Sequence, residues 1–287
     1  MLKKLSALFT LGLSLVLVAC SGKSADTAKE TTQWEKIEQA GVIKVATPGT
    51  YWPTSFHNDK DELTGYEIEL LNEIAKRLGV KVEYQELAFA ESFASVDNGS
   101  VDLFVNNLDS TPEREEKYNL SVPYKYSVSG MIVRADGSSG IEKADLSDWK
   151  GKKAAGEAGT NFMKLAEKLG AELVTYDNVS GDVYLRDVEN GRTDFIPNDY
   201  YTQALYVEMM KEQFPNLAMG KAKYNPTKQA MVMNKADNSL KQKIDPIIEE
   251  MIADGTLKAL SEKYYSGADL TKPEEGADKL PVVDFSK

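Results

Sequence analysis

Residues 63–84 read LTGYEIELLNEIAKRLGVKVEY, and this stretch predicts a helix that is followed at once by a strand. Residues 80–84 alternate between apolar and polar side chains, as a half-buried strand does. Gly79, just before them, ends the helical pattern. The helix is indicated by apolar residues at the three- and four-residue spacing of one helix face, Ile68, Leu71, Ile74, Ala75 and Leu78.

The same order of elements continues on both sides of this stretch. Apolar residues 42–46 predict a strand before the helix. On the other side a short helix ends at Asn98-Gly99, and residues 101–106 predict the next strand. Strands that alternate with helices in this way favour a parallel, doubly wound α/β sheet.

A second, similar series follows and predicts a second α/β lobe. A helix capped by Thr160 runs to Leu169, and another is expected over 182–190. Residues 228–233 predict a strand that returns to the first unit, and residues 244–265 predict two helices separated by Gly255. Two lobes joined by two crossings suggest a hinge and a central cleft, since ligands bind beyond the carboxyl ends of such strands. The strands expected in the second series are 129–134, 154–156, 172–176 and 193–196.

The composition limits the classes of function. With 287 residues the chain is long enough for about two domains. Its 34 basic and 45 acidic residues give a net charge of −11, which argues against a nucleic-acid-binding protein, since such proteins present a basic face. A single Cys excludes an intramolecular disulfide, and a single His excludes a site built from several histidines. That residue, His57, lies in a polar run and is expected in an exposed loop.

The N-terminus has the pattern of an exported lipoprotein. Two lysines precede an apolar run, residues 5–18, which is shorter than the roughly 20 residues that span a bilayer and fits a secretory signal. The run ends in LVAC, which resembles the bacterial lipobox with Cys20 as the lipidated residue. The alternative, a buried core cysteine, agrees poorly with the polar residues that follow at once. We therefore expect a signal peptide over 1–19, a flexible tether over 20–33 and a loosely ordered tail over 268–287.

Seven short motifs between about Trp34 and Lys272 together resemble one family, the family 3 bacterial extracellular solute-binding proteins, which are amino-acid receptors of ABC importers. The resemblance implies a periplasmic-binding-protein type II fold whose two lobes close around the ligand. Lobe 1 would contain residues 34–133 and 231–267, and lobe 2 residues 134–230. The motifs are LTGYEIEL at 63–70, NGSVD at 98–102, STPER at 110–114, GKK at 151–153, AGTN at 158–161, NGRTD at 190–194 and DGTL at 254–257.

The resemblance also implies what the protein does and with which partners. It would capture an amino acid and deliver it to the transmembrane permease of an importer driven by an ATPase. It would be a monomer on the extracytoplasmic face of the bacterial cell membrane, held by a diacyl (palmitate-type) lipid on Cys20. No cofactor, metal, catalytic residue or nucleic-acid partner is expected.

The ligand and one alternative function follow from finer features. Residues 159–161 and 254–265 look most like the cystine-binding members, so cystine or another polar amino acid is the expected ligand. Glutathione, which carries an amino-acid head, is an alternative ligand. An enzyme of the dehydratase or transglycosylase type is an alternative function on the same fold. The sequence, however, contains no nucleophile motif, metal cluster or phosphate-binding loop.

Four residues match family positions that grip the head of the amino acid. Arg114 matches the Arg that binds the α-carboxylate through a planar fork, although it also suits a surface helix. Asp199 matches the Asp that accepts the α-ammonium, and its alternative is a helix N-cap. Thr160 and Asn161 match a helix start that meets the carboxylate. Their alternatives are simple capping for Thr160 and an exposed first-turn residue for Asn161.

Further candidates would form the walls of the cleft. Tyr51 matches an aromatic that stacks on the ligand, and Phe89 lies where the family often has Trp. The alternative for both is an ordinary core aromatic, and Trp52 is a weaker candidate. Asn107 and Asp109 follow the strand that ends at 106. Asp109 replaces a Ser or Thr of the relatives and would pair with Arg114, accept a donor from the ligand, or only shape a turn.

Overall fold

Two larger β-sheets organise the described part of the chain. The structure is a computed structural model that describes residues 31–177 and 179–283. The strands are β1 Val42–Thr47, β2 Thr50–Tyr51, β3 Ser55–His57, β4 Leu63–Thr64, β5 Lys81–Glu86, β6 Leu103–Phe104, β7 Asn119–Leu120, β8 Lys125–Arg134, β9 Lys153–Glu157, β10 Glu172–Tyr176, β11 Phe195–Asp199, β12 Leu217–Met219, β13 Tyr224–Gln229 and β14 Val232–Met233.

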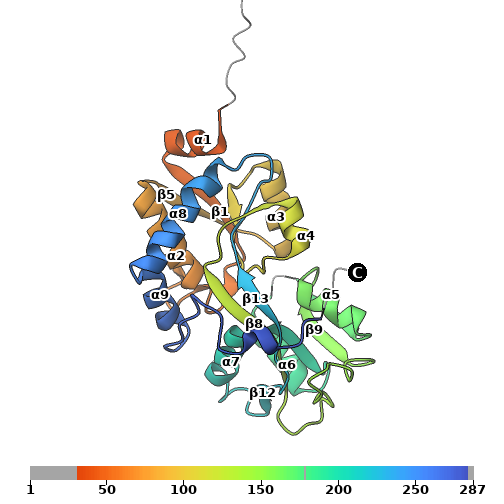
Figure 1. Cartoon of the computed structure of the whole chain (residues 1–287). Coiled ribbons are helices and arrows are strands. Elements are labelled where there is room, and N and C mark those ends of the chain that lie inside the picture. The colour runs from red at the N-terminus through yellow and green to blue at the C-terminus, as the bar shows by residue number, and fades with distance from the viewer. Residues whose placement is uncertain (1–30, 178, 284–287) are drawn as a thin grey trace, which may run out of the picture. The chain divides into compact units, whose positions relative to one another are not determined.

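Helices cover the sheets on both faces. Figure 1 shows α2, α8 and α9 on one side of the first sheet and α3 and α4 on the other. The helices are α1 Gln33–Ala40, α2 Tyr66–Leu78, α3 Phe89–Asn98, α4 Pro112–Lys117, α5 Asn161–Lys168, α6 Gly181–Glu189, α7 Tyr200–Met209, α8 Ser239–Ala253, α9 Thr256–Tyr264 and the short 3-10 helix η1 Ala277–Lys279.

The first sheet has the strand order β5–β1–β6–β14–β7 and forms lobe 1. Strand β1 is parallel to β5 and β6, as the alternating pattern predicts, whereas β14 is antiparallel to β6 and β7. Helix α2 connects β1 to β5 and ends at Gly79, whose φ of 74° is a left-handed conformation that favours glycine. The apolar face of α2 is buried in the core of this lobe, and each such Leu or Ile contributes about 1.5–3 kcal/mol.

The second sheet has the order β10–β9–β11–β8–β12, with β13 also paired to β8, and forms lobe 2. Strands β9, β10 and β11 are parallel, so their carboxyl ends point to the same edge. Trp149 is fully buried in this lobe against Phe195 and Tyr224, with ring centroids 4.6 and 5.7 Å away. The mixed α/β architecture with two lobes agrees with the expected fold class.

One expected boundary between the lobes and one expected strand are wrong, whereas the expected boundary at 230/231 agrees with the sheets. The limit after Val133 cuts through β8, but β8 pairs along its length with β11, β12 and β13 and belongs wholly to the second sheet. The single strand expected over 228–233 is in fact two strands, because β13 pairs in the second sheet and β14 in the first. The chain therefore crosses between the lobes near residues 121–124 and 230–231.

The segment after α9 is packed and not a loose tail up to Val283. Leu270 is buried in the core of lobe 1, and its main-chain oxygen accepts a hydrogen bond from the N–H of Tyr126 on β8. Farther along, the N–H of Asn225 on β13 donates to the oxygen of Pro281, and the N–H of Val283 donates to the side chain of Asn225. Composition does not predict this packing, because main-chain hydrogen bonds and only a few apolar side chains hold the segment. It crosses from lobe 1 to lobe 2 a third time.

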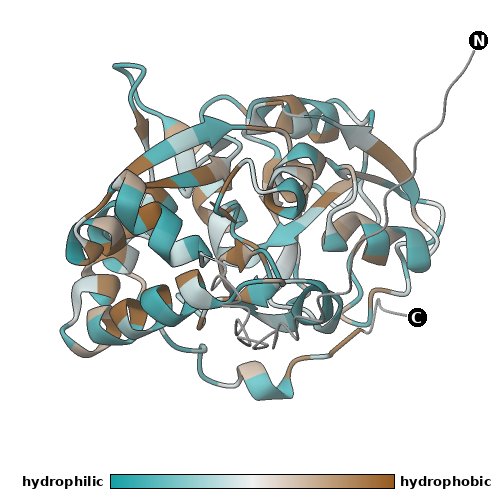
Figure 2. Cartoon of the chain, turned by 90° about the horizontal axis from the view of Figure 1, so that it is seen from above, coloured by the Kyte–Doolittle hydropathy of each residue, from teal (hydrophilic) through white to brown (hydrophobic). Residues whose placement is uncertain are grey.

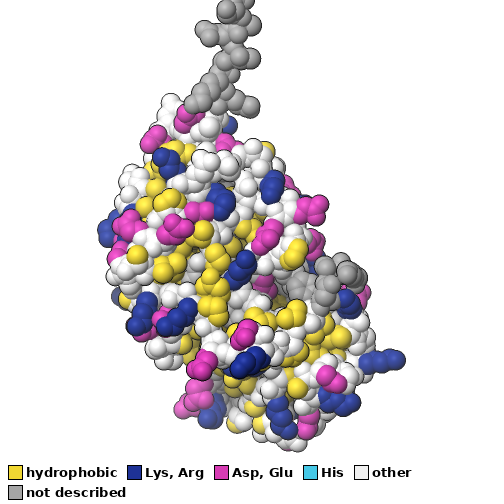
Figure 3. All heavy atoms as spheres, viewed as in Figure 1, with side chains coloured by type: hydrophobic (Ala, Val, Ile, Leu, Met, Phe, Trp, Pro, Cys, Tyr) yellow, Lys and Arg dark blue, Asp and Glu magenta, His cyan; other side chains and the backbone are white. Residues whose placement is uncertain are grey.

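The surface agrees with the composition. In Figure 2 the helices carry both hydrophobic and hydrophilic residues along their length, as amphipathic helices do. On the face drawn in Figure 3, acidic and basic side chains are intermixed. Residues 1–30, including the expected signal peptide, Cys20 and most of the tether, lie outside the described residues. Among residues 31–177 and 179–283, no helix has the length and apolar character needed to cross a membrane.

Candidate functional site

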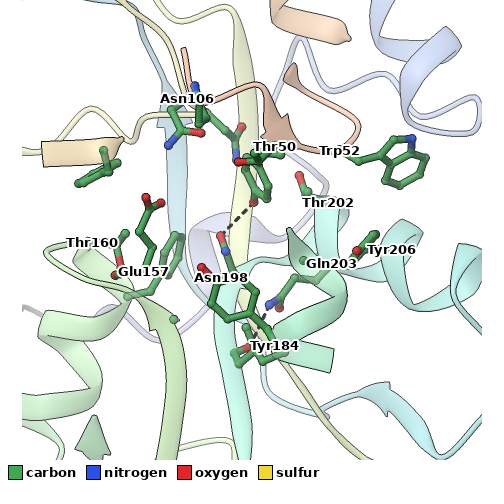
Figure 4. Close-up of a pocket in the computed structure, with 18 of the residues that line it drawn as sticks. Thr50, Trp52, Asn106, Glu157, Thr160, Tyr184, Asn198, Thr202, Gln203 and Tyr206 are labelled. Atoms are coloured by element: carbon green, nitrogen blue, oxygen red, sulfur yellow. Dashed lines mark hydrogen bonds between the residues drawn. The ribbon is translucent and has the colours of Figure 1, made fainter. Parts of the chain in front are cut away.

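A cavity of about 480 Å³ lies between the two lobes. This volume is in the range of small-molecule sites, about 300–1,000 Å³. Its walls come from the loops after β1 and β6 in lobe 1 and from β9, α5, α6, β11 and α7 in lobe 2. Figure 4 shows these side chains converging from both lobes. Seven of the eight expected site residues line the cavity: Tyr51, Phe89, Asn107, Asp109, Arg114, Thr160 and Asn161.

Arg114 presents a cation to this cavity. It lies on α4, whose start is fixed by Thr111 as N-cap and by a proline in the first turn. One nitrogen of the guanidinium donates to the main-chain oxygen of Asp109 at 2.8 Å, and the group lies 5.6 Å from the ring centroid of Phe93. Burial lowers the pKa of Arg114, and the charge of Asp109 opposes this shift. Among the described residues no carboxylate lies within ion-pair distance of it, so the guanidinium can still accept an anion from a ligand.

Asp109 is held by a neighbour of its own. Its carboxylate accepts a hydrogen bond of 2.9 Å from the side-chain amide of Gln229, and the two residues also form a β-bridge. Burial raises the pKa of Asp109, while the nearby Arg114 lowers it. The Asp109 carboxylate of lobe 1 thus contacts the last residue of β13, the strand that leads back from lobe 2. A contact between Asp109 and the ligand stays a prediction.

Asp199 does not line the cavity. It is 2% exposed, and its two carboxylate oxygens accept hydrogen bonds of 2.8 Å from Lys125 Nζ and from the N–H of Thr202. The second bond makes Asp199 the N-cap of α7, which is the alternative role given for this residue in the sequence analysis. Burial would raise the pKa of Asp199, but Lys125 and the hydrogen bonds outweigh burial, and the pKa lies below its ordinary value. A contact between Asp199 and a ligand ammonium stays a prediction, and it requires Lys125 to share or leave this carboxylate.

Lys125 is a buried charged residue behind the cavity wall that the sequence did not single out. Its side chain is fully buried, and its ammonium group also donates to the side-chain oxygen of Asn107 at 2.9 Å. Because Asn107 belongs to lobe 1 and Asp199 to lobe 2, the lysine ties both lobes together at a crossing strand. Lys125 begins β8, just before the buried residues 127–133, and a lysine in this position is the signal that could have revealed it, since an unpaired buried charge is rare.

Thr160 and Asn161 stand where α5 begins. The hydroxyl of Thr160 donates to the main-chain oxygen of Glu157 at 3.0 Å and caps the helix through the N–H of Met163. The side-chain nitrogen of Asn161 is buried and has no hydrogen-bond partner among the described residues. Such a donor costs about 1–3 kcal/mol if it stays unpaired, so it favours a ligand that accepts a hydrogen bond.

Aromatic side chains line both lobes. Tyr51 donates from its hydroxyl to the side-chain oxygen of Asn198 at 3.1 Å, which connects lobe 1 to lobe 2. Burial raises the pKa of Tyr51, and Asp199 adds to the shift. Trp52 faces Tyr206 across the cavity mouth with ring centroids 6.1 Å apart. Phe89 lines the cavity and also packs in an aromatic cluster of lobe 1, and its contact with the ligand stays a prediction.

Several residues of the cavity wall were not expected from the sequence. Glu157 and Asn198 lie at or near the carboxyl ends of β9 and β11, where the strand pattern could have indicated them. Thr202 and Gln203 on α7 each leave a buried side-chain oxygen without a hydrogen-bond partner among the described residues. Outside the cavity wall, an ion pair of 3.1 Å between Glu113 of α4 and Lys164 of α5 joins the two lobes. Within the described ranges, no group of His, Cys, Asp or Glu is arranged to hold a metal ion.

Comparisons with known proteins give the family. Residues 43–267 match the model of "Bacterial extracellular solute-binding proteins, family 3". The chain is 47% identical over 270 residues to the probable ABC transporter extracellular-binding protein YckB of Bacillus subtilis. The aligned residues make up 92% of each of the two chains. The crystal structure of that protein matches with a TM-score of 0.69 and covers 88% of this chain and 100% of the other. The L-cystine-binding protein TcyA of the same bacterium is 31% identical, over 95% of this chain and 100% of its own.

One match belongs to an enzyme that shares the fold. The chain is 30% identical to part of a membrane-bound lytic murein transglycosylase F of Aeromonas hydrophila, but the match covers only 50% of that protein. YckB and TcyA, which match over most of their length, are named as binding proteins. The fold is therefore that of the type II periplasmic binding proteins. With its cavity between two α/β lobes and a family match over most of its length, the chain belongs to family 3 of the bacterial extracellular solute-binding proteins.

Proposed function

We propose that this protein captures a free amino acid, with cystine or another polar amino acid as the best candidate, and delivers it to the membrane permease of an ABC importer. The observation that carries the proposal is the Arg114 guanidinium, which lies half-buried at the cavity wall without a carboxylate partner among the described residues. A planar fork of donors suits the α-carboxylate that all amino acids share. The relatives named as L-cystine-binding proteins support the ligand class.

The same cavity supports binding and not catalysis as the function. Catalysis by a carboxyl group needs an acid or base that is held against the bond to be broken. Each polar side chain discussed above instead contributes a hydrogen-bond donor, a hydrogen-bond acceptor or an apolar wall. The proposed cycle is therefore capture between the lobes, exclusion of water and docking of the closed form on the permease, whose ATPase drives release.

The first test is a thermal-shift screen of the mature protein, residues 20–287, against the common amino acids, cystine and glutathione. We expect an amino acid to raise the melting temperature through mass action on the folded state. Glutathione is the second candidate ligand, because its γ-glutamyl end carries the same head group. A screen in which neither an amino acid nor glutathione raises the melting temperature would contradict the proposed function.

We also propose that Cys20 is lipidated and holds the mature protein on the outer face of the cell membrane. Relatives described as extracellular solute-binding proteins support this location. Cys20→Ala should abolish incorporation of labelled fatty acid and move the protein out of the membrane fraction. Retention of the label in the Cys20→Ala variant would show that the lipid is attached elsewhere or that the lipobox interpretation is wrong.

A further inference from the structure

The cavity wall contains few side chains that can carry a charge, and two of the four named here already have partners. Among the described lining residues, the side chains that can carry a charge are His57, Asp109, Arg114 and Glu157. The ring nitrogen Nε2 of His57 lies 3.0 Å from the carboxylate of Glu86. Asp109 accepts the amide of Gln229. This leaves a cation on lobe 1, Arg114, and an anion on lobe 2, Glu157.

Glu157 stands at the carboxyl end of a central strand. Strand β9 lies between β10 and β11 in the second sheet, and Glu157 is its last residue. Figure 4 shows the Glu157 carboxylate directed away from its strand and into the cavity. Among residues 31–177 and 179–283, no Lys, Arg or His forms an ion pair with it. A carboxylate in this position is open to a group that enters the cavity.

The surroundings of Glu157 make its ionised form less stable. Burial raises the pKa of Glu157, the N–H of Phe89 opposes this shift, and the nearby Asp177 adds to it. Its charge also contributes to the raised pKa of Tyr184, another residue of the cavity wall. An ionised carboxylate that is partly desolvated and unpaired is stabilised when a cation arrives.

Asp199, the acid expected to receive the ligand ammonium, already has a cationic partner in Lys125. Asp199 is buried behind the wall, and its carboxylate is neutralised by Lys125 at 2.8 Å. A ligand cation would have to compete with an ammonium group that the chain itself supplies. Glu157 needs no such exchange.

We propose that Glu157 binds a positively charged group of the ligand, so that the ligand bridges Arg114 of lobe 1 and Glu157 of lobe 2 as a zwitterion. This inference rests on the proposed function and names the chemistry of its substrate. The positive group is an ammonium or guanidinium, and it has two sources, the α-amino group or a cationic group at the far end of the ligand. A ligand with opposite charges on opposite lobes also stabilises their closure, because each lobe holds one end.

The test compares Glu157→Gln with wild type and with the control Glu172→Gln, by calorimetry and thermal shift. Gln keeps the size of the side chain and removes its charge. Glu172 is exposed on the neighbouring strand β10 and is not among the residues that line the cavity. The probes are cystine and arginine, which carry a cationic group at the far end, glutamine, which carries only the α-ammonium, and agmatine and cystamine, which are cationic and lack a carboxylate.

We expect Glu157→Gln to weaken binding of the cationic probes by roughly 30-fold or more, as is typical when one partner of a desolvated charge pair is removed. If only cystine and arginine among the amino acids lose affinity, the far cation meets Glu157, and if glutamine loses as much, the α-ammonium does. The ligand-free Glu157→Gln protein should melt at the same temperature as wild type or higher, which separates a ligand role from a structural one. Glu172→Gln should bind as wild type does.

Other results would separate the two proposals. If wild type binds amino acids and Glu157→Gln binds every probe within about threefold of it, the inference is wrong and the proposed function stands. If wild type binds agmatine or cystamine in a Glu157-dependent way but no amino acid, Glu157 holds a cation, but both the proposed function and the zwitterion bridge are wrong. Failure of wild type to bind any amino acid, agmatine or cystamine would also overturn both.

Discussion

At the scale of single residues, the polar groups of the cavity are arranged as opposite charges on opposite walls. Arg114 is supplied by a six-residue helix of lobe 1 whose start is fixed by Thr111 and a proline. The guanidinium is oriented by one hydrogen bond to a main-chain oxygen, which leaves its other donors for a ligand. A lysine cannot replace this group, because its ammonium is a point charge without a fork.

The first prediction concerns Arg114. Arg114→Ala should reduce affinity for the amino acid by roughly 30-fold or more, which corresponds to about 2–5 kcal/mol for a buried charge that loses its partner. Arg114→Lys should also bind poorly, while both variants stay folded because the side chain borders the cavity. Calorimetry measures both. Affinity within about threefold of wild type in the Ala variant, under 1 kcal/mol, would show that Arg114 does not hold the carboxylate.

At the scale of the structural elements, strand β8 carries a buried ion pair with its neighbour β11 inside lobe 2. Lys125 and Asp199 have side-chain exposures of 0% and 1% and lie 2.8 Å apart. Taking two charges out of water is costly, and removing only one leaves the other uncompensated. The pair therefore specifies how β8 and β11 meet beneath the cavity.

The second prediction tests this pair. Lys125→Met should lower the free energy of unfolding by about 3–5 kcal/mol, and the double variant Lys125→Met/Asp199→Asn should lose less than the sum of the two single changes. Urea unfolding measures all three. As a control, Lys258→Met removes an exposed helical pair of 3.4 Å, with Glu262, and should cost under about 0.5 kcal/mol. Strictly additive losses would mean that the buried pair is not coupled.

A buried glutamate at the start of α2 makes stability depend on pH. Glu67 accepts hydrogen bonds from the N–H of Asn107, at 2.6 Å, and from the hydroxyl of Tyr124, and so holds the loop of lobe 1 that lines the cavity. Burial raises the pKa of Glu67 from 4.5 to about 6, against the hydrogen bonds that lower it. The folded state therefore binds this proton more tightly than the unfolded state.

The third prediction follows from the raised pKa of Glu67 in the folded state. Between pH 4.5 and about 6 the folded protein holds more protons at Glu67, so this group makes stability fall as pH rises through that window. The full difference is about 2 kcal/mol. Glu67→Gln keeps an acceptor for both donors and should flatten the stability profile between pH 4.5 and 7, measured by urea unfolding at each pH. An unchanged slope in the variant would assign the pH dependence to other groups.

The sequence predicts best those elements whose pattern and end signals agree. Helix α2 and strand β10 lie where their patterns predicted, with Gly79 as the helix stop. Helix α4 was expected only as the alternative for Arg114, a surface helix, because its six residues bury no side chain and so show no apolar pattern. The pairing of Lys125 with Asp199 could not be predicted either, because it joins residues 74 positions apart through a charge that a hydropathy pattern assigns to the surface.

At the scale of the whole described unit, the chain passes between the lobes three times and not twice. The third passage brings Glu274 against lobe 2, where its carboxylate pairs with Lys223 at 2.9 Å and accepts the hydroxyl of Tyr201 at 2.5 Å. Burial would raise the pKa of Glu274, but these two partners lower it below its ordinary value. The segment therefore contributes stability as a strap between the lobes.

The fourth prediction compares two neighbouring glutamates on this strap. Glu274→Ala should lower the free energy of unfolding by about 1–2 kcal/mol, because it removes charged hydrogen bonds that are only partly exposed to water. Glu275→Ala, at an exposed position, should change it by less than about 0.5 kcal/mol. Thermal or urea unfolding measures both. Equal effects of the two substitutions would show that the strap is not held by Glu274.

The central claim is that the two lobes close on an amino acid held at the cavity between them. In the structure the lobes already touch, through Tyr51 with Asn198 and Glu113 with Lys164. A hinged pair of lobes populates more open arrangements without ligand, and a ligand that contacts both lobes shifts the population to the closed one.

Small-angle scattering of the mature protein with and without saturating ligand tests this most directly. We expect the radius of gyration of wild type to decrease when the amino acid that binds in the thermal-shift screen is added, and the radius of Arg114→Ala to stay unchanged at the same concentration. A wild-type protein that binds this amino acid by calorimetry without any decrease in the radius of gyration would contradict closure of the lobes around the ligand.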